Sequence, residues 1–584
     1  MIFKRKVTVT VVSLAMLSTF SSAFLPTTMS KKAISSQLFL GIFGKRRRGT
    51  ISTRSMSVDN GVHLEKDNTP EKKLSFLERS ASYKELIGKL QTITQLRQAS
   101  AVLDYDRMVL MPSSDGAAAS RAGQQSALAS VIHEKSTDPS IGELVKAAEL
   151  DLEDSDKEEK KVLDLTRKAF EKNEVISPEL EGKRAALSSS AYAAWAKARS
   201  ADDYSMFEPI LGDCFKTMKQ FAEAYRSTDA KYESEPLYSI MLDEFEMGMK
   251  ASRIDDIFGE IEDALVPLIR KVLGPSATPP RDDALNGKFD IASQKKVNEE
   301  IVTALGYNIE GGRIDESLHP FSISFSPSDV RITSRYSTNE WYQGLAATMH
   351  EGGHAMYEQN LGDSGLEIDS FLSMGTHESQ SLFWERHVGM SKEFCEWCTP
   401  KLRDAYGKEL DCTAEELYGA VNKVSPGFIR VEADELTYPL HVILRYNIER
   451  DVIGGNLAVN DIPTRWNESM QSMLSVTVTK DSLGCLQDMH WSGLAIGYFP
   501  TYLIGSATAA QLAYYCEKDI PDMYERISRG EFSDIKAWLT EKVHRHGRRY
   551  DSLDALLKDQ VGEELNPKYF INYLTEKYTE LYKC

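Results

Sequence analysis

The sequence predicts one large, predominantly α-helical domain preceded by an N-terminal presequence. From about residue 78 onward, apolar residues recur at the spacing of amphipathic helices. No internal repeat, long Gly/Ser linker or change of composition divides this part of the chain. With 584 residues, 42% of them hydrophobic, the protein can bury a large core. One short segment departs from the helical pattern and predicts strands.

The first 77 residues have the composition of a targeting sequence. Residues 1–23 have a basic start, an apolar run too short to span a membrane and a small-residue exit, as in a signal peptide. Residues 24–77 form a transit peptide and linker that lacks acidic residues before Asp59. Phe24 after the expected cut resembles the junction of bipartite plastid presequences in algae with secondary plastids. We expect plastid import, with secretion as the alternative.

The helical domain is expected over residues 78–584. Its first helix carries one apolar stripe, formed by Leu86, Leu90, Ile93, Leu96 and Leu103. The same periodicity, with charged residues on the opposite face, recurs over 157–174, 216–230, 253–273 and 413–425.

The segment "FSISFSPSDVRITSRY" alternates apolar and polar residues and predicts a β-hairpin. Ile323 and Phe325 alternate with serines before a Ser-Pro-Ser-Asp turn, and Val330 and Ile332 alternate with polar residues after it. The hairpin ends about fourteen residues before His350. A sheet edge there could bind an extended peptide through main-chain hydrogen bonds.

Charge and cysteine content exclude several classes of function. The formal net charge of −18 argues against nucleic acid or an anionic membrane as the main partner of the mature protein. Seven cysteines are few and odd in number, so a disulfide framework is not expected. Cys395 and Cys398 form one CxxC without the second pair of a zinc ribbon, and we interpret them as reduced thiols.

The stretch "TMHEGGHAMYEQN" indicates a metal site. On a helix, His350 and His354 share a face and can bind one ion. Glu351 is rotated by about 100° from His350, where a carboxylate can take a proton from water activated by zinc. Gly352 and Gly353 each cost a helix about 1 kcal/mol, so we expect a neighbouring helix to approach closely there.

Two histidines leave a tetrahedral site short of a third protein ligand. Glu358 is about 12 Å along the helix from His350 and too distant to share the ion. "GTHESQSLFWERHVG" predicts a second helix with Glu378 and Glu385 on one face. His377 is a further candidate. The chemistry of these residues does not choose between them.

At this point the sequence resembles the carboxypeptidase Taq family of zinc metallocarboxypeptidases from about residue 80 to the end. Five stretches match that family's motifs in order: Asp329-Val330-Arg331-Ile332-Thr333, the HEGGH at 350–354, His377-Glu378-Ser379-Gln380, Ile429-Arg430 with Ala433-Asp434, and Gly484 with Gln487-Asp488-Met489-His490-Trp491. "LDYDRMVLMP" resembles a further family segment, with Tyr105 where tryptophan is usual. Leu382 departs from the family's usual arginine.

The resemblance implies an almost wholly helical fold with a deep groove, usually in a homodimer. It implies removal of single residues from peptide C-termini with broad specificity. By the same resemblance, Glu378 corresponds to the third zinc ligand and Glu351 to the general base. One Zn²⁺ per chain is expected, with Co²⁺ or Mn²⁺ as substitutes.

Residues from the other motifs are candidates for binding the substrate. Arg331 and Arg430 could hold the free carboxylate of a peptide, although a structural salt bridge is an equal alternative for either. "HWSGLAIGYFPTY" supplies His490, Tyr498 and Tyr502, in an arrangement similar to that of related helical zinc peptidases. A neutral tyrosine can donate a hydrogen bond to the developing oxyanion, and core packing is the alternative role.

Three other functions compete with a carboxypeptidase. An oligoendopeptidase of the same architecture typically has a further histidine where this chain has Tyr357. A zinc aminopeptidase would show a Gly-x-Met-Glu-Asn stretch, and the sequence has none. A non-catalytic, metal-stabilised peptide-binding protein would have no use for Glu351.

Overall fold

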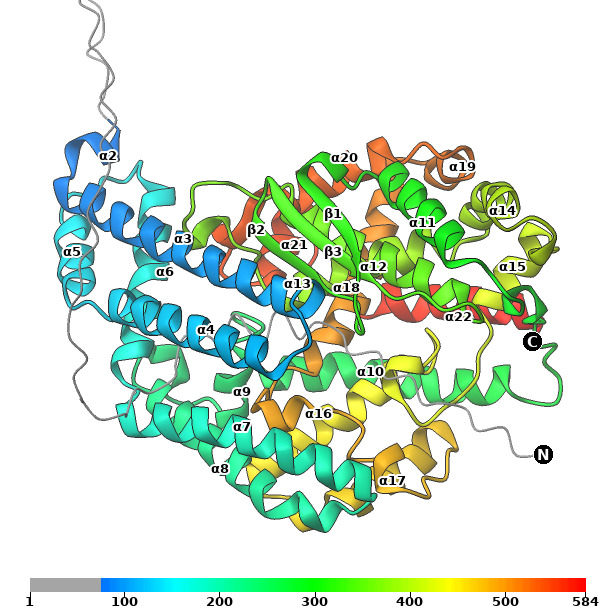
Figure 1. The fold of residues 1–584 in the computed structure, drawn as a ribbon, viewed down its shortest axis with the longest axis horizontal. Helices are drawn as coiled ribbons and strands as arrows, with labels where there is room; N and C mark the ends of the chain where they lie inside the picture. The colour runs from blue at the N-terminus through cyan, green and yellow to red at the C-terminus, as the bar shows by residue number, and fades with distance from the viewer. Residues whose placement is uncertain (1–74) are drawn as a thin grey trace, which may run out of the picture.

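The computed structural model describes residues 75–584, which form a helical protein around one small sheet (Figure 1). The predicted signal peptide and almost all of the transit peptide and linker therefore lie outside the described residues. Within the described part, the predicted all-α class with a small sheet is confirmed. No helix of this part is long and apolar enough to cross a membrane.

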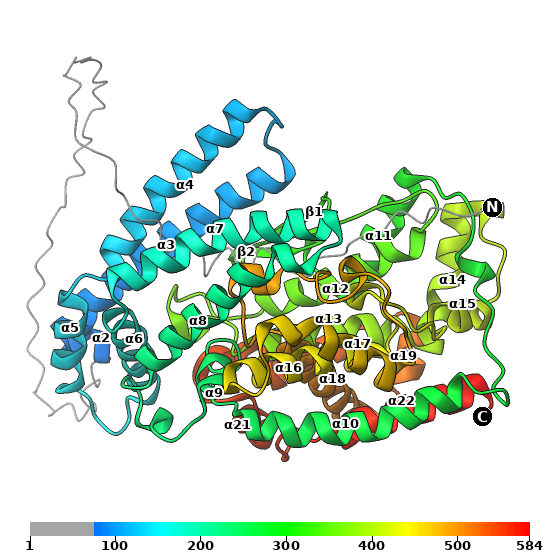
Figure 2. The same cartoon turned by 90° about the horizontal axis from the view of Figure 1, so that it is seen from below.

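The N-terminal helices form an arm along one side of the molecule (Figure 2). They are α2 (Phe76–Arg79), α3 (Ala81–Val109), α4 (Asp115–Ser136), α5 (Ser140–Glu149), α6 (Lys157–Glu174), α7 (Pro178–Ala201) and α8 (Glu208–Tyr225). The predicted stripe on α3 buries Leu86 and Ile93 in a core of their own, together with Val145 of α5 and Val162 of α6. The predicted helix 157–174 coincides with α6.

The sheet contains the predicted hairpin and one additional strand. Strands β2 (Ser322–Ser326) and β3 (Asp329–Ser334) pair antiparallel, and Ile323 lies opposite Arg331. Strand β1 (Gly312–Glu316) pairs parallel with β3, which gives the order β1-β3-β2. The sequence did not predict β1 because Ile314 is its only large apolar residue. Strand β3 packs on α12 (Trp341–Glu358), which carries the HEGGH motif.

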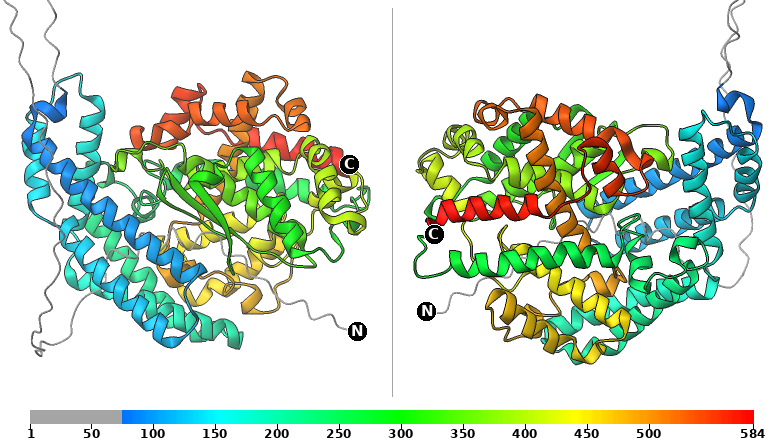
Figure 3. Two further views of the ribbon diagram at one scale, coloured as in Figure 1. Left: turned by 45° about the horizontal axis from the view of Figure 1, so that its top comes forward. Right: turned by 180° about the vertical axis from the view of Figure 1, so that it is seen from behind.

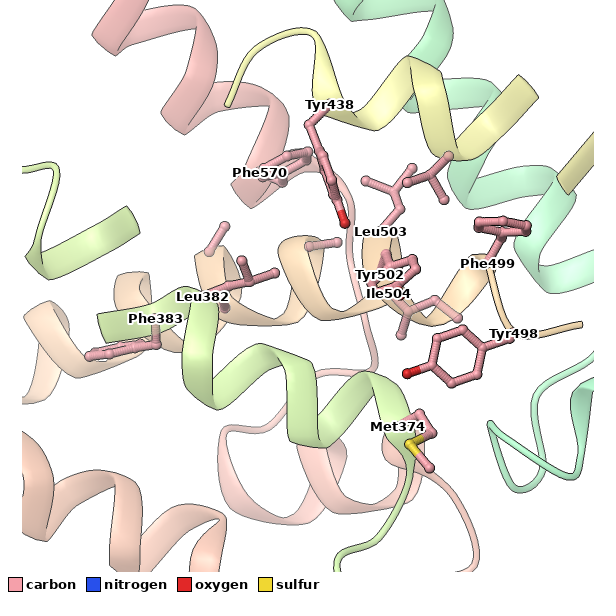
Figure 4. Packing of buried hydrophobic residues seen from close by; sticks show 14 of the residues in the cluster. Met374, Leu382, Phe383, Tyr438, Tyr498, Phe499, Tyr502, Leu503, Ile504 and Phe570 are labelled. Atoms are coloured by element: carbon pink, nitrogen blue, oxygen red, sulfur yellow. The ribbon is translucent and has the colours of Figure 1, made fainter. Parts of the chain in front are cut away.

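Helix α12 crosses α13 (Met374–Leu382), and α13 lies along α18 (Pro500–Asp519). Almost every residue of α18 up to Ala513 is buried, so its apolar residues cover all sides. In the close view, Tyr502, Leu503 and Ile504 of α18 lie among side chains of α13 and α16 (Tyr438–Gly454) (Figure 4). This packing fixes the height and rotation of α13 in the core.

The remaining helices surround this centre. They are α9 (Leu237–Leu242), α10 (Ala251–Val272), α11 (Ile291–Leu305), α14 (Lys392–Tyr406), α15 (Ala414–Val421), α17 (Ile462–Leu474), α19 (Met523–Arg529), α20 (Ser533–Lys542), α21 (Leu553–Gln560) and α22 (Lys568–Tyr582). Figure 3 shows α10 and α22 side by side across the back of the molecule. The predicted helices 253–273 and 413–425 correspond to α10 and α15, and 216–230 overlaps the second half of α8.

A cleft of about 1940 Å³ lies between the N-terminal helices and the centre of the protein, although α7 and α8 also pack into the main core. Helices α3, α6, α7 and α8 line one side. Strand β2, most of residues 361–374, Met489 and residues 493–496 contribute to the other. The deep groove that the family resemblance implied is therefore present.

Candidate metal and active site

Three side chains from two helices converge where the sequence predicts a metal: His354 and Glu378 are buried, and His350 is partly buried. Ligand atoms of His350 and His354 on α12 and of Glu378 on α13 all lie within 4.8 Å of one another. Nε2 of His354 is 3.6 Å from a carboxylate oxygen of Glu378. Nε2 of His350 is buried and has no hydrogen-bond partner among the described residues. Two imidazole nitrogens and one carboxylate are a donor set that fits zinc and leaves a fourth position open.

The other ring nitrogen of each histidine is held by a hydrogen bond. Nδ1 of His350 is 2.7 Å from Glu385, and Nδ1 of His354 is 3.0 Å from the carbonyl oxygen of His377. If each Nδ1 carries the proton, both Nε2 atoms present lone pairs to the site. Glu385 thus contacts His350 through Nδ1 and lies outside the three-residue group. Glu358 and His377 also lie outside this group, and they contact each other at 3.0 Å.

Glycines permit the helices to approach each other. A Cβ atom at Gly353 would lie 2.6 Å from the carbonyl oxygen of Gln380 and from Cα of Ser381, both on α13. A Cβ atom at Gly505 of α18 would lie 2.7 Å from Cβ of Glu378. The expectation that the motif's glycines allow close approach of a helix carrying a further ligand candidate is confirmed for Gly353.

Glu351 is a buried carboxylate beside the three-residue group. One of its oxygens, Oε2, has no hydrogen-bond partner in the described part of the chain. Burial raises the pKa of Glu351 to about 7, with His350 acting in the opposite direction and Glu378 adding to the rise. A carboxylate with a pKa near neutrality is suited to accept and return a proton.

The site concentrates negative charge in a buried space. Glu351, Glu378 and Glu385 all lie near His350 and repel one another electrostatically. Burial lowers the pKa of His350, but the Glu385 hydrogen bond and the nearby carboxylates outweigh it and raise the pKa to about 9. A cation at the centre would relieve the repulsion among the carboxylates.

Glu246 anchors the N-terminal end of α13. Its side chain accepts a hydrogen bond from the backbone N–H of Gly375, and the neighbouring carbonyl of Phe245 accepts one from Met374. Burial raises the pKa of Glu246 to about 8, against hydrogen bonds from Ser373 and Gly375. The sequence analysis did not identify this residue, because it lies about 130 positions before the helix that it contacts.

His490, Tyr498 and Tyr502 are brought together as one buried aromatic group. Nε2 of His490 is 3.1 Å from the Tyr502 hydroxyl, and the Tyr498 and Tyr502 rings are 5.3 Å apart. Burial and the charge of Arg430 lower the pKa of His490 to about 3, so it is neutral. Burial and nearby Glu378 hold the pKa of Tyr498 above its usual range, so its hydroxyl stays protonated and can donate.

Arg430 is buried next to the aromatic group, with its guanidinium 4.6 Å from the Tyr502 ring centre. It donates to one oxygen of Asp488 at 3.0 and 3.3 Å, while Arg445 donates to the other at 2.6 Å. Burial raises the pKa of Asp488, but the two arginines outweigh this and hold it well below its usual range. Two cations therefore share one anion, and the group carries one excess positive charge.

Arg331 lies on the sheet, apart from this buried group. It forms two hydrogen bonds of 2.8 Å with Asp329. Its guanidinium packs over the rings of Tyr105 and Phe325, at 5.1 and 4.8 Å. This geometry is that of a structural salt bridge in an aromatic cradle, and a role in binding substrate stays a prediction. Leu382, which stands where the resembled family usually has arginine, is buried in the core.

The cleft adjoins the metal-binding group. Ser322 and Met374 line the cleft, whereas the three ligand candidates lie behind its wall. Burial raises the pKa of Glu351, and a hydrogen bond from the cleft residue Ser322 lowers it, which connects the cleft surface to this carboxylate.

Comparisons with known proteins agree with these features. Residues 85–578 match the family model described as carboxypeptidase Taq (M32) metallopeptidase. The chain is 38% identical to carboxypeptidase 1 of Bacillus subtilis, over 85% of this chain and 98% of that protein. It is 35% identical to thermostable carboxypeptidase 1 of Pyrococcus furiosus, over 86% and 99%. The crystal structure of an M32 carboxypeptidase from Deinococcus radiodurans superposes with a TM-score of 0.82 at 34% identity, covering 86% of this chain and all of that one.

Proposed function

Since this chain belongs to the carboxypeptidase Taq (M32) family of metallopeptidases, we propose that it is a zinc-dependent carboxypeptidase that releases single C-terminal residues from peptides. The observation that carries the proposal is the convergence of His350, His354 and Glu378 with the buried Glu351 beside them. Broad specificity is part of the proposal, as the resemblance implied.

His350, His354 and Glu378 would hold the metal ion. Zinc there would supply Lewis-acid chemistry, polarising the scissile carbonyl and acidifying water. The same donors would accept Co²⁺ or Mn²⁺. Oε2 of Glu351, free of other partners among the described residues, takes the proton of the attacking water and returns it to the leaving nitrogen. The hydrogen bonds that His350 Nδ1–H donates to Glu385 and His354 Nδ1–H donates to the His377 carbonyl keep both imidazoles oriented.

The excess positive charge at Asp488 supports recognition of a free C-terminus. A buried cation without a counter-ion is unfavourable, so an anion that reaches Arg430 gains a charge-assisted contact. Nη1 of Arg430 has only a weak contact of 3.4 Å, with the Tyr438 hydroxyl. The terminal carboxylate of a peptide would complete this group. Tyr498 and neutral His490 are suited to contact the scissile peptide unit, and Tyr502 orients His490.

The proposal extends to the protein's assembly and location. We infer a homodimer from the family resemblance and plastid import from the presequence, with secretion as the alternative. A fluorescent fusion of residues 1–75 should enter the plastid, and Phe24→Ala should divert it. Appearance of the parent fusion in the medium would favour secretion instead.

Digestion of one N-terminally blocked peptide tests the activity against its alternatives. Stepwise loss of residues from the C-terminus supports the carboxypeptidase, whereas internal cuts indicate an oligoendopeptidase. No products from the metal-loaded protein would indicate a peptide-binding protein. Tyr357 bears on the second option: its buried hydroxyl accepts a hydrogen bond from the backbone of Leu372, so this position has a structural function here.

A further inference from the structure

A third arginine lies at the wall of the cleft, on a helix that packs against the segment carrying Asp488. Arg199 lies near the C-terminal end of α7, on the N-terminal arm, and lines the cleft. Burial lowers its pKa, and the charge of Asp488 raises it. No ion pair or side-chain hydrogen bond joins Arg199 to another described residue.

The position of Arg199 is nevertheless defined. Its guanidinium packs over the ring of Trp195 at 5.5 Å, one turn earlier on the same helix. The indole N–H of Trp195 donates to the carbonyl oxygen of Leu486 at 3.0 Å, which ties this turn of α7 to the segment that carries Asp488. The cation is thus held at the wall of the cleft, on the turn of α7 that is hydrogen-bonded to the segment carrying Asp488.

Asp488 cannot neutralise this third cation, because its two oxygens already accept from Arg430 and Arg445. Two other cations that line the cleft have acidic partners: Arg184 binds Glu181 at 2.6 Å, and Lys172 binds Glu244. Three guanidinium groups against one carboxylate leave two positive charges in excess, in a protein whose formal net charge is −18. Such a local positive field attracts anionic groups into the cleft.

We propose that Arg199 binds a carboxylate of the peptide in the cleft and is a specificity-determining residue of the reaction. The inference rests on the proposed carboxypeptidase function, because it takes a peptide as the ligand. Two sources can supply the carboxylate: the C-terminus itself, shared with Arg430, or an acidic side chain in one of the last two residues. In either case a guanidinium stacked on an aromatic ring is oriented to form a bidentate hydrogen-bonded contact with a carboxylate.

The test compares Arg199→Gln with the parent as metal-loaded enzymes. The substrates are two N-blocked peptides with free C-termini, which differ only by Gln or Glu at the penultimate position, and a second such pair that differs at the last position. The amidated form of the Gln peptide is measured as a competitive inhibitor. A charge-assisted contact contributes more than tenfold, so we expect kcat/KM to fall at least tenfold for every peptide that presents the bound carboxylate.

The two sources give different patterns. If Arg199 binds the terminal carboxylate, Arg199→Gln slows all free-acid peptides at least tenfold and leaves inhibition by the amide unchanged. If Arg199 binds an acidic side chain, kcat/KM falls at least tenfold only for the peptides with Glu at the position that Arg199 contacts. Unchanged kcat/KM for all peptides, or equal weakening of the free acids and the amide, would refute the proposal.

Control variants separate this role from folding. Arg184→Gln removes another arginine of the cleft, whose charge is already paired, and it should leave kcat/KM for every peptide unchanged. Arg199→Lys retains the positive charge and should recover part of the kcat/KM that Arg199→Gln loses. Metal content and melting temperature should match the parent in all three variants. If the parent releases no C-terminal residue, the proposed function fails; Arg199 is then tested by calorimetric binding of the acid and amide peptides to parent and Arg199→Gln.

Discussion

Replacing Gly353 by alanine should separate the metal ligands on α12 from Glu378 on α13. The added Cβ would lie 2.6 Å from two backbone atoms of α13, whereas ordinary contacts begin at 3.4 Å. Backbone atoms within a packed helix cannot rotate away, so the helices must move apart by about 0.8 Å. Metal–ligand distances tolerate only about 0.2 Å, and we therefore expect the affinity for zinc to fall at least tenfold.

The effect on stability should be smaller than the effect on metal binding. Overpacking costs about 1–3 kcal/mol, while alanine in place of glycine within a helix contributes about 1 kcal/mol in favour of folding. The metal-free variant should therefore be destabilised by no more than about 2 kcal/mol. Zinc affinity is measured by competition with a chelator, and stability by thermal unfolding of the metal-free protein.

Gly259 in α10 provides the matched control, because a Cβ atom there meets no atom within 4 Å. Gly259→Ala should leave zinc affinity unchanged and raise stability by up to about 1 kcal/mol. If Gly353→Ala binds zinc as tightly as the parent and unfolds at the same or a higher temperature, then close approach of α12 and α13 does not set the geometry of the site.

Four further substitutions test individual residues. Glu351→Gln should keep about one metal per chain but lose nearly all hydrolysis, since only the proton acceptor is removed; activity within tenfold of the parent would contradict this. His354→Ala should lose the metal itself, as measured by elemental analysis. Arg430→Ala should abolish the preference for a free-acid peptide over its amide, read from the ratio of kcat/KM, and an unchanged ratio would place carboxylate recognition elsewhere. Because Glu246 has a raised pKa of about 8, its carboxyl retains a proton in the folded protein that it releases in the unfolded chain, and its contribution to stability falls as pH rises from about 4.5 to 8. The melting temperature of Glu246→Gln should therefore rise relative to that of the parent between pH 5 and pH 8. A difference in melting temperature that stays constant over this range would contradict the shifted pKa.

Features of the site that depend on one helix could be predicted from the sequence. His350 and His354 share a face because a helix repeats every 3.6 residues, and Gly353 signalled a close helix crossing because glycine is otherwise unfavourable there. The β2–β3 hairpin was likewise visible from its alternation and its turn. Strand β1 was not, because its side chains are mostly polar and its pairing with β3 depends on tertiary contacts.

Features that depend on the meeting of distant segments could not be predicted in this way. Glu378 and Glu385 are seven residues apart and equally suitable in sequence, but α13 continues as a π-helix over Phe383–Val388. Such a bulge changes the rotation of the residues after it. In the structure Glu378 joins the two histidines and Glu385 contacts the back of His350. The ion pairs of Asp488 with Arg430 and Arg445 join segments 43 and 58 residues apart, with no periodic pattern to connect them.

The active-site region has two buried charge imbalances of opposite sign. Carboxylates gather around His350, and arginines gather around Asp488. Tyr438 interacts with both groups: its hydroxyl is 3.4 Å from Arg430, and its pKa is raised by burial, lowered by Arg430 and raised by the charge of Glu378. A cation is attracted to the first group and a peptide carboxylate to the second. The fixed distance between the two groups would then determine which peptide bond faces Glu351. The two unbalanced sets of charges would thereby confine cleavage to the C-terminal end of the peptide.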